Sequence, residues 1–412
     1  MDLKERLEKI SQLQEKINKM TSSSKKNSRK PEKEKGVRID EVLSGVFTKT
    51  PFGESFVCEN YFPLDYICGE INFSKIFSSP AHYLSQLLGD EQLKKMDFRK
   101  TVFLDTETTG LAGGTGTFAF LVGLGYFTDS QFCVRQYFMR DFDEEPALLA
   151  SLNELLSQFE CVVTYNGKAF DLPLMESRFI MSGMEMNLRE PLHLDLLYPV
   201  RRLWKKRLEN CSLSTVERDI LSIYRENDVP GYLVPAIYFR YLQSKDAREI
   251  KGVFDHNLQD ILSLVALTVK INDFLKEPLN TDFFPIDIYS LGKIFDKKKE
   301  YIKSTFYYNE VLKFDLPGEQ LLETLKSLSF AYKRQKKWNE AENIWKETIS
   351  KSDAFIYYPY EELAKYYEHC LRDYKKAENI VKEALTMIED DFLKGQLEHR
   401  LNRIKSKSGK KG

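Results

Sequence analysis

The pattern of apolar residues changes several times along this chain of 412 residues. Between Leu3 and Met20, apolar residues recur every three or four positions, which predicts a narrow amphipathic helix. The Ser- and Lys-rich stretch that follows has almost no apolar residues, so residues 1–36 are expected to be a helix and a disordered basic linker. Residues 37–100 mix short β-like runs with one helical stretch, and we interpret them as a leader packed on the next domain.

Residues 101–275 alternate short apolar runs with amphipathic stretches. The strand-like runs are 101–107, 117–126, 131–139 and 161–165, and the helical stretches include 144–159 and 172–181. The first three runs have short connections, which predict an antiparallel meander. A meander that leads into β-α-β units predicts an α/β domain with a mixed sheet and helices on its faces.

The remainder of the chain has a helical repeat from residue 282 to about 392. Small and aromatic residues recur together at intervals of 37 and then 35 residues, at Gly292/Phe295, Ser329/Tyr332 and Ala364/Tyr367. This period is close to the ~34 residues of tetratricopeptide repeats. We therefore expect an all-α solenoid of that type, which would bind a protein partner. Residues 393–412 are expected to be a basic tail, and the stretch from Arg400 to Gly412, which has no acidic residue, is expected to be frayed.

Charge and cysteine usage narrow the class of protein. The chain has 61 Lys and Arg against 62 Asp and Glu, so any nucleic-acid surface must be local. Its six cysteines are scattered and form no Cys-x-x-Cys pair, which indicates neither a zinc site nor a disulfide framework. No apolar run approaches the ~20 residues that a membrane helix needs. The expectation is a soluble, cytoplasmic protein without a signal peptide.

Acidic residues follow two of the predicted strands and recur on a late helix. Asp105 and Glu107 are two apart at the end of the first strand, so their side chains share a face. Adjacent anions repel, and a bound Mg²⁺ or Mn²⁺ ion would remove that cost. Asp171 opens a helix after the fourth strand, and His256 and Asp260 share a helix face. Taken singly, each has a simpler explanation as a strand end, a helix cap or a surface histidine.

Together these motifs occur in the order Asp-x-Glu, Asn-x-x-x-Phe-Asp and His-x-x-x-Asp. In this order they resemble the DEDD family of 3′–5′ exonucleases, over about residues 101–270. The resemblance implies a ribonuclease-H-like fold with a mixed five-stranded sheet and flanking helices. It also implies that Asp105, Glu107, Asp171 and Asp260 hold two ions, Mg²⁺ or Mn²⁺, and that His256 is the general base. Family members with a histidine usually place it one residue further from the last Asp, and the spacing seen here normally carries a tyrosine.

Other segments resemble a narrower family. They are Asp195-Leu196-Leu197-Tyr198-Pro199, the segment Asp228-Val229-Pro230-Gly231, Tyr238-Phe239-Arg240-Tyr241 and His256-Asn257. These segments look like the bacterial YprB-type proteins, a family that couples a ribonuclease-H-like exonuclease domain to tetratricopeptide repeats. The resemblance implies the same order of domains that the apolar pattern predicts here.

Candidate substrate contacts fall in two groups. Thr108, Asn166 and Phe170 lie in the acidic motifs themselves. Arg201, Arg202 and Lys205 belong to a basic run on a predicted helix, which fits a phosphate contact and a solvated helix face equally well.

The leading interpretation is a metal-dependent 3′–5′ exonuclease that acts on nucleic acid at a single-stranded 3′ end, with repeats that bind a protein partner. One alternative is a structure-selective endonuclease that uses the same metals. The other is an interaction scaffold whose nuclease fold only binds nucleic acid. Contacts to the 2′-hydroxyl decide between RNA and DNA, and these contacts depend on the tertiary structure.

Overall fold

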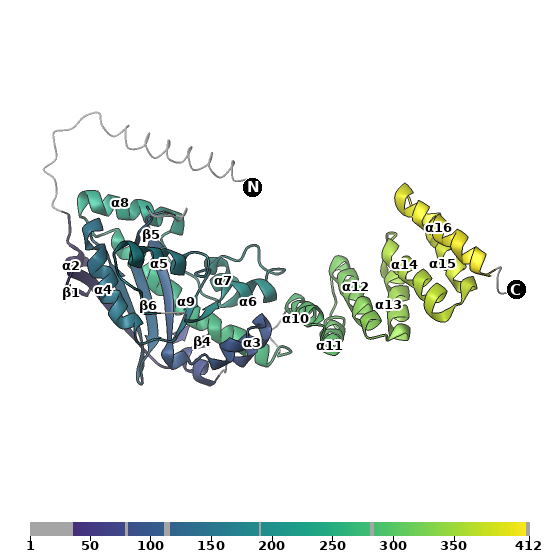
Figure 1. Cartoon of the computed structure of the whole chain (residues 1–412), viewed down its shortest axis with the longest axis horizontal. Helices are drawn as coiled ribbons and strands as arrows, with labels where there is room; N and C mark the ends of the chain where they lie inside the picture. Colours follow the sequence, from purple (N-terminus) through teal and green to yellow (C-terminus); the bar gives the residue numbers. More distant parts are fainter. Residues whose placement is uncertain (1–35, 79–80, 111–115, 189–190, 281–283, 409–412) are drawn as a thin grey trace, which may run out of the picture.

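A computed structural model of the chain describes residues 36–78, 81–110, 116–188, 191–280 and 284–408. An α/β body carries an arm of helices, which extends from one side of it (Figure 1). The helix expected between Leu3 and Met20 and nearly all of the linker lie outside the described residues. Within the described residues, no helix is long and apolar enough to cross a membrane.

The body is built on one sheet of seven strands, in the order β1-β2-β7-β6-β5-β8-β9. The strands are β1 (Gly45–Thr50), β2 (Gly53–Pro63), β5 (Thr101–Thr108), β6 (Ala119–Phe127), β7 (Gln131–Phe138), β8 (Cys161–Thr164) and β9 (Leu192–Asp195). Across the sheet from β1 through β2, β7 and β6 to β5, neighbouring strands are antiparallel. Strands β5, β8 and β9 are parallel to one another. The mixed sheet is therefore confirmed, with the meander and the first β-α-β unit where the apolar pattern predicted them.

The expected number of five strands is wrong, because the leader extends the same sheet. β1 and β2 form a hairpin, and β2 pairs with β7 along eight residues from Phe56 to Pro63. The two strands of the leader shield an edge of β7 that would otherwise expose unpaired backbone groups. A small second sheet pairs β3 (Ile67–Cys68) with β4 (Ile71–Asn72).

Helices pack on the large sheet and on one another (Figure 1). The helices of the body are α2 (Ile39–Val42), α3 (His82–Leu88), α4 (Glu145–Leu156), α5 (Asp171–Met181), α6 (Leu197–Leu203), α7 (Leu213–Ile220), α8 (Val234–Ser244) and α9 (Ile250–Lys276). Alternate residues of β5 enter different cores, since Phe103 packs in the core with the C-terminal half of α9 and Leu104 packs in the core with α4. Asp105 and Glu107 continue the row of Phe103, so they lie on the face that α9 covers.

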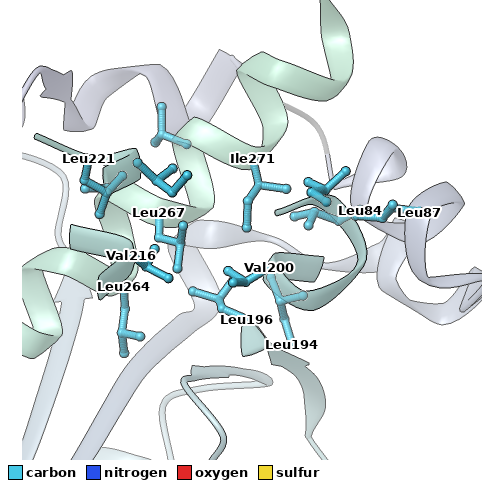
Figure 2. Close-up of a cluster of buried hydrophobic side chains, with 14 of the residues drawn as sticks. Leu84, Leu87, Leu194, Leu196, Val200, Val216, Leu221, Leu264, Leu267 and Ile271 are labelled. Carbon is cyan, nitrogen blue, oxygen red and sulfur yellow. The ribbon is translucent and has the colours of Figure 1, made fainter. Parts of the chain in front are cut away.

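An apolar cluster fixes α9 against the segment that follows β9 (Figure 2). Leu264, Leu267 and Ile271 of α9 meet Leu196 and Val200 in this cluster. These five side chains are between 0% and 1% exposed. Burying a Leu or Ile side chain contributes about 1.5–3 kcal/mol, so this contact places α6 firmly beside the sheet edge.

The arm consists of helices that each pack on the next. They are α10 (Pro285–Lys297), α11 (Tyr301–Val311), α12 (Gly318–Arg334), α13 (Trp338–Lys351), α14 (Tyr357–Lys365), α15 (Tyr374–Met387) and α16 (Asp391–Ser408). A Cβ atom on Gly292 would lie 2.4 Å from the Tyr308 ring, so α10 and α11 cross closely only because position 292 has no side chain.

The end of the arm is an ordered helix where a frayed basic tail was expected. Leu397 and Ile404 of α16 are fully buried. Arg403 and Lys407 hydrogen bond to Glu368, whose side chain is 0% exposed. Burial alone would raise the pKa of Glu368, but these cationic partners outweigh it and lower the pKa to about 2. The basic residues thus neutralise a buried carboxylate, which the charge pattern alone did not reveal.

Candidate active site

Three elements bring acidic side chains to one edge of the sheet. Asp105 and Glu107 lie at the carboxyl end of β5, and Asp171 opens α5 after β8. Because β5 and β8 are parallel neighbours, their carboxyl ends reach the same edge. The hydroxyl of Thr106 donates to Oδ1 of Asp171 at 2.5 Å, which ties the start of α5 to β5.

Helix α9 completes the cluster from the side. Nε2 of His256 lies 3.5 Å from Oδ2 of Asp260, one helical turn further on. The same nitrogen lies 3.9 Å from Oε1 of Glu107 on β5. Ligand atoms of Glu107, His256 and Asp260 all fall within 4.8 Å of one another, which is compact enough for a shared cation.

Asn257, the neighbour of His256, holds Asp105 in place. Its side-chain amide donates to Oδ2 of Asp105 at 2.8 Å, and its own oxygen accepts from Nε2 of Gln136 at 2.9 Å. Asn257 is 0% exposed and reaches β5 only because Gly123 on β6 leaves room for it. A Cβ atom at Gly123 would lie 2.3 Å from Oδ1 of Asn257. Packing of α9 on the sheet therefore sets the position of Asp105.

Arg225 is a cation at the border of the acidic cluster. Its guanidinium forms a two-pronged ion pair with Glu217 and also donates to Asp260 and Asp228. The side chain of Arg225 is 11% exposed, and that of Glu217 is 1% exposed. Burial raises the pKa of Glu217, and the pairing with Arg225 offsets this rise only in part. The arginine orients Asp260 and removes part of the negative charge around it.

Hydrogen bonds also define the orientation of the His256 ring. Nδ1 lies 2.8 Å from Oδ1 of Asp228 and 3.2 Å from Nη1 of Arg225. Nδ1 cannot both donate to the carboxylate and accept from the guanidinium, and the shorter contact favours a proton on Nδ1. In that tautomer Nε2 carries the lone pair, and it faces Glu107 and Asp260.

Burial and mutual repulsion disfavour the charged forms of these carboxylates. Burial is the main cause that raises the pKa of Asp105, and the charges of Asp260 and Asp171 raise it further. Burial is also the main cause that raises the pKa of Glu107, and the charges of Asp105, Asp260 and Asp171 raise it further. Burial raises the pKa of Asp171 to about 6, against the opposing hydrogen bond from Thr106.

The donor set fits a hard divalent cation. It consists of carboxylate oxygens and one imidazole, which are ligands that Mg²⁺ and Mn²⁺ accept. In the described part of the chain, no hydrogen bond reaches Oδ1 of Asp105 or either oxygen of Glu107. In the structure Glu107, His256 and Asp260 are the residues whose ligand atoms come within range of one cation, and Asp105 and Asp171 lie near them.

The proposed substrate contacts divide in the structure. Thr108 follows Glu107 on β5, the backbone N–H of Asn166 donates to Asp195, and Phe170 precedes Asp171 and is 54% exposed. Arg201 and Arg202 lie on α6, and Lys205 follows it, so this basic run is separate from the acidic cluster.

Asp195 is a supporting residue whose role the sequence did not reveal. Its carboxylate accepts from the backbone N–H groups of Asn166 at 2.7 Å and Lys168 at 3.1 Å. It also caps the start of α6 by accepting from Leu197 N–H at 3.1 Å. Asp195 thereby ties the turn before Asp171 to the end of β9.

The other supporting residues are Arg225, Glu217, Gln136 and Asn257. Arg225 and Glu217 lie outside any acidic motif, and Gln136 sits in the middle of a strand, so no spacing rule indicates them. One sequence feature indicates Asn257, which directly follows His256 on a helix that packs on the sheet.

Comparison with known proteins agrees with this fold. Residues 102–272 match the ribonuclease H superfamily, so the body contains a nuclease-like domain of that class. The chain is also 33% identical over 287 residues to the uncharacterized protein YprB of Bacillus subtilis (strain 168). That alignment covers 69% of this chain and 68% of the relative. The chain therefore belongs to the YprB-type family of ribonuclease-H-like proteins.

Proposed function

We propose that this protein is a metal-dependent 3′–5′ exonuclease that hydrolyses phosphodiester bonds at single-stranded 3′ ends of nucleic acid. The observation that carries the proposal is the meeting of Asp105, Glu107, Asp171 and Asp260 at one sheet edge, where burial and repulsion raise the pKa of the first three. Such a cluster costs free energy unless cations offset it, and two cations suit phosphodiester hydrolysis.

The chain's own residues have distinct tasks in this reaction. Bound Mg²⁺ or Mn²⁺ would stabilise the charge on the attacking and leaving oxygens. Nε2 of His256 accepts a proton from the attacking water, and Asp228 stabilises the imidazolium through Nδ1. The water oxygen bonds to phosphorus while the bond from phosphorus to the 3′-oxygen breaks. Asn257 and Arg225 hold Asp105 and Asp260 in position throughout.

We also propose that helices α10 to α15 are tetratricopeptide-type repeats that recruit a protein partner. Support comes from the close crossing at Gly292 and from the recurrence of small residues on successive helices, which include the buried Ser329, Ala341, Ala364 and Ala377. Charge reversal on the exposed faces of α12 to α15 should abolish partner capture without changing hydrolysis.

The first test is degradation of labelled single- and double-stranded RNA and DNA by the purified protein with Mg²⁺ or Mn²⁺. Asp105→Asn should lower the rate more than about 100-fold, since changes in residues that only support ligands already cost 10–100-fold. The variant should remain folded, because it relieves repulsion in the metal-free site. A wild-type protein that leaves every substrate intact would favour the scaffold alternative.

The pattern of products distinguishes an exonuclease from an endonuclease. A 5′-labelled strand should yield a ladder that shortens by single nucleotides, and a 3′-labelled strand should release its label at once as a mononucleotide. Internal fragments from both substrates would support the endonuclease alternative instead.

The second test separates two roles of His256. His256→Gln should lower kcat by about 10²–10⁴-fold, because it removes the proton acceptor. Its affinity for Mn²⁺, measured by electron paramagnetic resonance, should change little if the ring is a base. A large loss of Mn²⁺ affinity would instead make His256 a metal ligand.

A further inference from the structure

Helices α6 and α10 pack together where the arm joins the body (Figure 1), and a basic groove lies between them. Seven of its eleven lining residues are Lys or Arg, and none is acidic. The basic residues are Arg201, Arg202, Lys205, Lys206, Lys293, Lys297 and Lys298. The whole chain has a net charge of only −1, so this concentration of positive charge is local.

Two helical segments supply the charges in facing rows. On the body side, Arg201 and Lys205 are four residues apart, as are Arg202 and Lys206. On the arm side, Lys293 and Lys297 are also four apart, so they share a face of α10. The rows face each other because α10 packs on α6. An ion pair between Arg207, which follows α6, and Asp287 of α10 spans 2.7 Å and helps to hold α10 in this position.

Few of these charges are neutralised by the protein. Lys206 pairs with Glu323 at 2.7 Å, and Arg202 donates to the backbone oxygen of Leu87. Among the described residues, no carboxylate lies within ion-pair distance of Arg201, Lys205, Lys293, Lys297 or Lys298. Burial lowers the pKa of Lys298, and the positive charge of Arg202 lowers it further. The groove therefore attracts anions.

The groove lies along α6, away from the acidic cluster. Helix α6 starts two residues after Asp195, the residue that ties the turn before Asp171 to the end of β9. Val200 of α6 meets Ile271, which lies fifteen residues after His256 on α9, so Arg201 and Arg202 are roughly 20 Å from the acidic cluster and only a strand that extends well past its 3′ end can reach both. Cations spread over two helices suit a polyanion with repeating phosphates better than a single small anion.

From this geometry we propose that the groove binds the phosphodiester backbone of the strand whose 3′ end enters the acidic cluster. That this strand is the substrate of the acidic cluster rests on the proposed function. It assigns the arm a part in substrate binding, because α10 supplies one wall of the groove. Phosphate contacts carry no sequence information, so the groove should hold any strand equally well.

The test uses the full chain and the double charge reversal Lys205→Glu/Lys297→Glu, two exposed positions on opposite walls. The matched control is Lys375→Glu/Lys394→Glu, which makes the same charge change at exposed positions of α15 and α16. Binding of a long fluorescein-labelled single strand is measured by anisotropy in EDTA over a range of salt concentrations. The groove variant should bind more weakly than the control, and its log–log salt slope should fall by about 1.4, or ~0.7 for each lost contact.

The control variant should hydrolyse a dinucleotide at the wild-type kcat/KM, which shows that charge reversal on the arm leaves the folded protein intact. Equal affinity and salt slope for the groove and control variants would overturn the proposal. So would equally tight competition by poly-glutamate, which would make the occupant an acidic protein. If no variant hydrolyses any substrate but strand binding still depends on Lys205 and Lys297, the proposed function fails and the groove stands.

Discussion

At the scale of single residues, Arg225 shows how the fold handles an excess of negative charge. The guanidinium lies between Asp260 of the candidate active site and Glu217 behind it. Glu217 also accepts from the hydroxyl of Ser263 on α9. Because two carboxylates depend on one cation, removal of Arg225 leaves a buried charge without its main partner.

Arg225→Met should therefore reduce the free energy of unfolding by about 3–5 kcal/mol, the usual cost of breaking a buried ion pair from one side. The double variant Arg225→Met/Glu217→Gln should recover much of this loss, since it removes the unpaired charge as well. Urea unfolding of the wild type, both single variants and the double variant gives the coupling energy. Additive effects of the two changes would contradict the pairing.

At the scale of secondary-structure elements, the packing of α9 on β6 decides the geometry of the site. Two glycines of β6 allow the close approach, with Gly123 under Asn257 and Gly125 under Ile261. Gly123 is also the register partner of Asp105 on β5. The same contact thus stabilises the sheet and holds a proposed metal ligand.

Gly123→Ala and Gly125→Ala form a matched pair for testing this contact. The added Cβ would lie 2.3 Å from Asn257 in one and 2.4 Å from Ile261 in the other, so each should lower stability by about 1–3 kcal/mol. Only Gly123→Ala should also weaken Mn²⁺ binding, by about 10–100-fold, because it displaces the side chain that holds Asp105. Calorimetric Mn²⁺ titration of both variants measures the difference, and equal affinities would show that Asn257 does not position the ligand.

At the scale of the whole molecule, the body and the first helices of the arm share one hydrophobic core. Val200 and Leu203 of α6 belong to the same buried cluster as Ile288 and Leu291 of α10. Asp287 is buried at this junction, with its side chain 3% exposed. Burial raises its pKa to about 6, even though Arg207 pairs with Oδ2.

This raised pKa gives the junction a dependence on pH. Between about pH 4 and pH 6 the folded state holds a proton on Asp287 that the unfolded state has released, so its contribution to stability falls as pH rises through this range. The unfolding free energy of the wild type, relative to that of Asp287→Asn, should therefore fall by about 2–3 kcal/mol from pH 4 to pH 7. Urea unfolding across this range measures it, and a flat difference would refute the assignment.

Much of this molecule follows from local patterns. Alternating and continuous apolar runs located β5 to β8, and α4 and α5, within a few residues, because strand and helix periods depend on neighbours in the sequence. The order of the acidic motifs likewise predicted that Asp105, Glu107, Asp171, His256 and Asp260 belong together, and the structure brings ligand atoms of Glu107, His256 and Asp260 within 4.8 Å of one another. The sequence by itself thus determined the class of fold and the candidate acidic site.

Other features depend on contacts between distant segments, which no local pattern records. The pairing of β2 with β7 made the sheet seven strands wide, and a buried Glu368 ordered the expected tail. Arg225 meets Asp260 across 35 residues of sequence, and the groove exists only where α10 reaches α6. The tertiary structure alone decided these features, because charge pairing and burial are set by proximity in space and not by spacing along the chain.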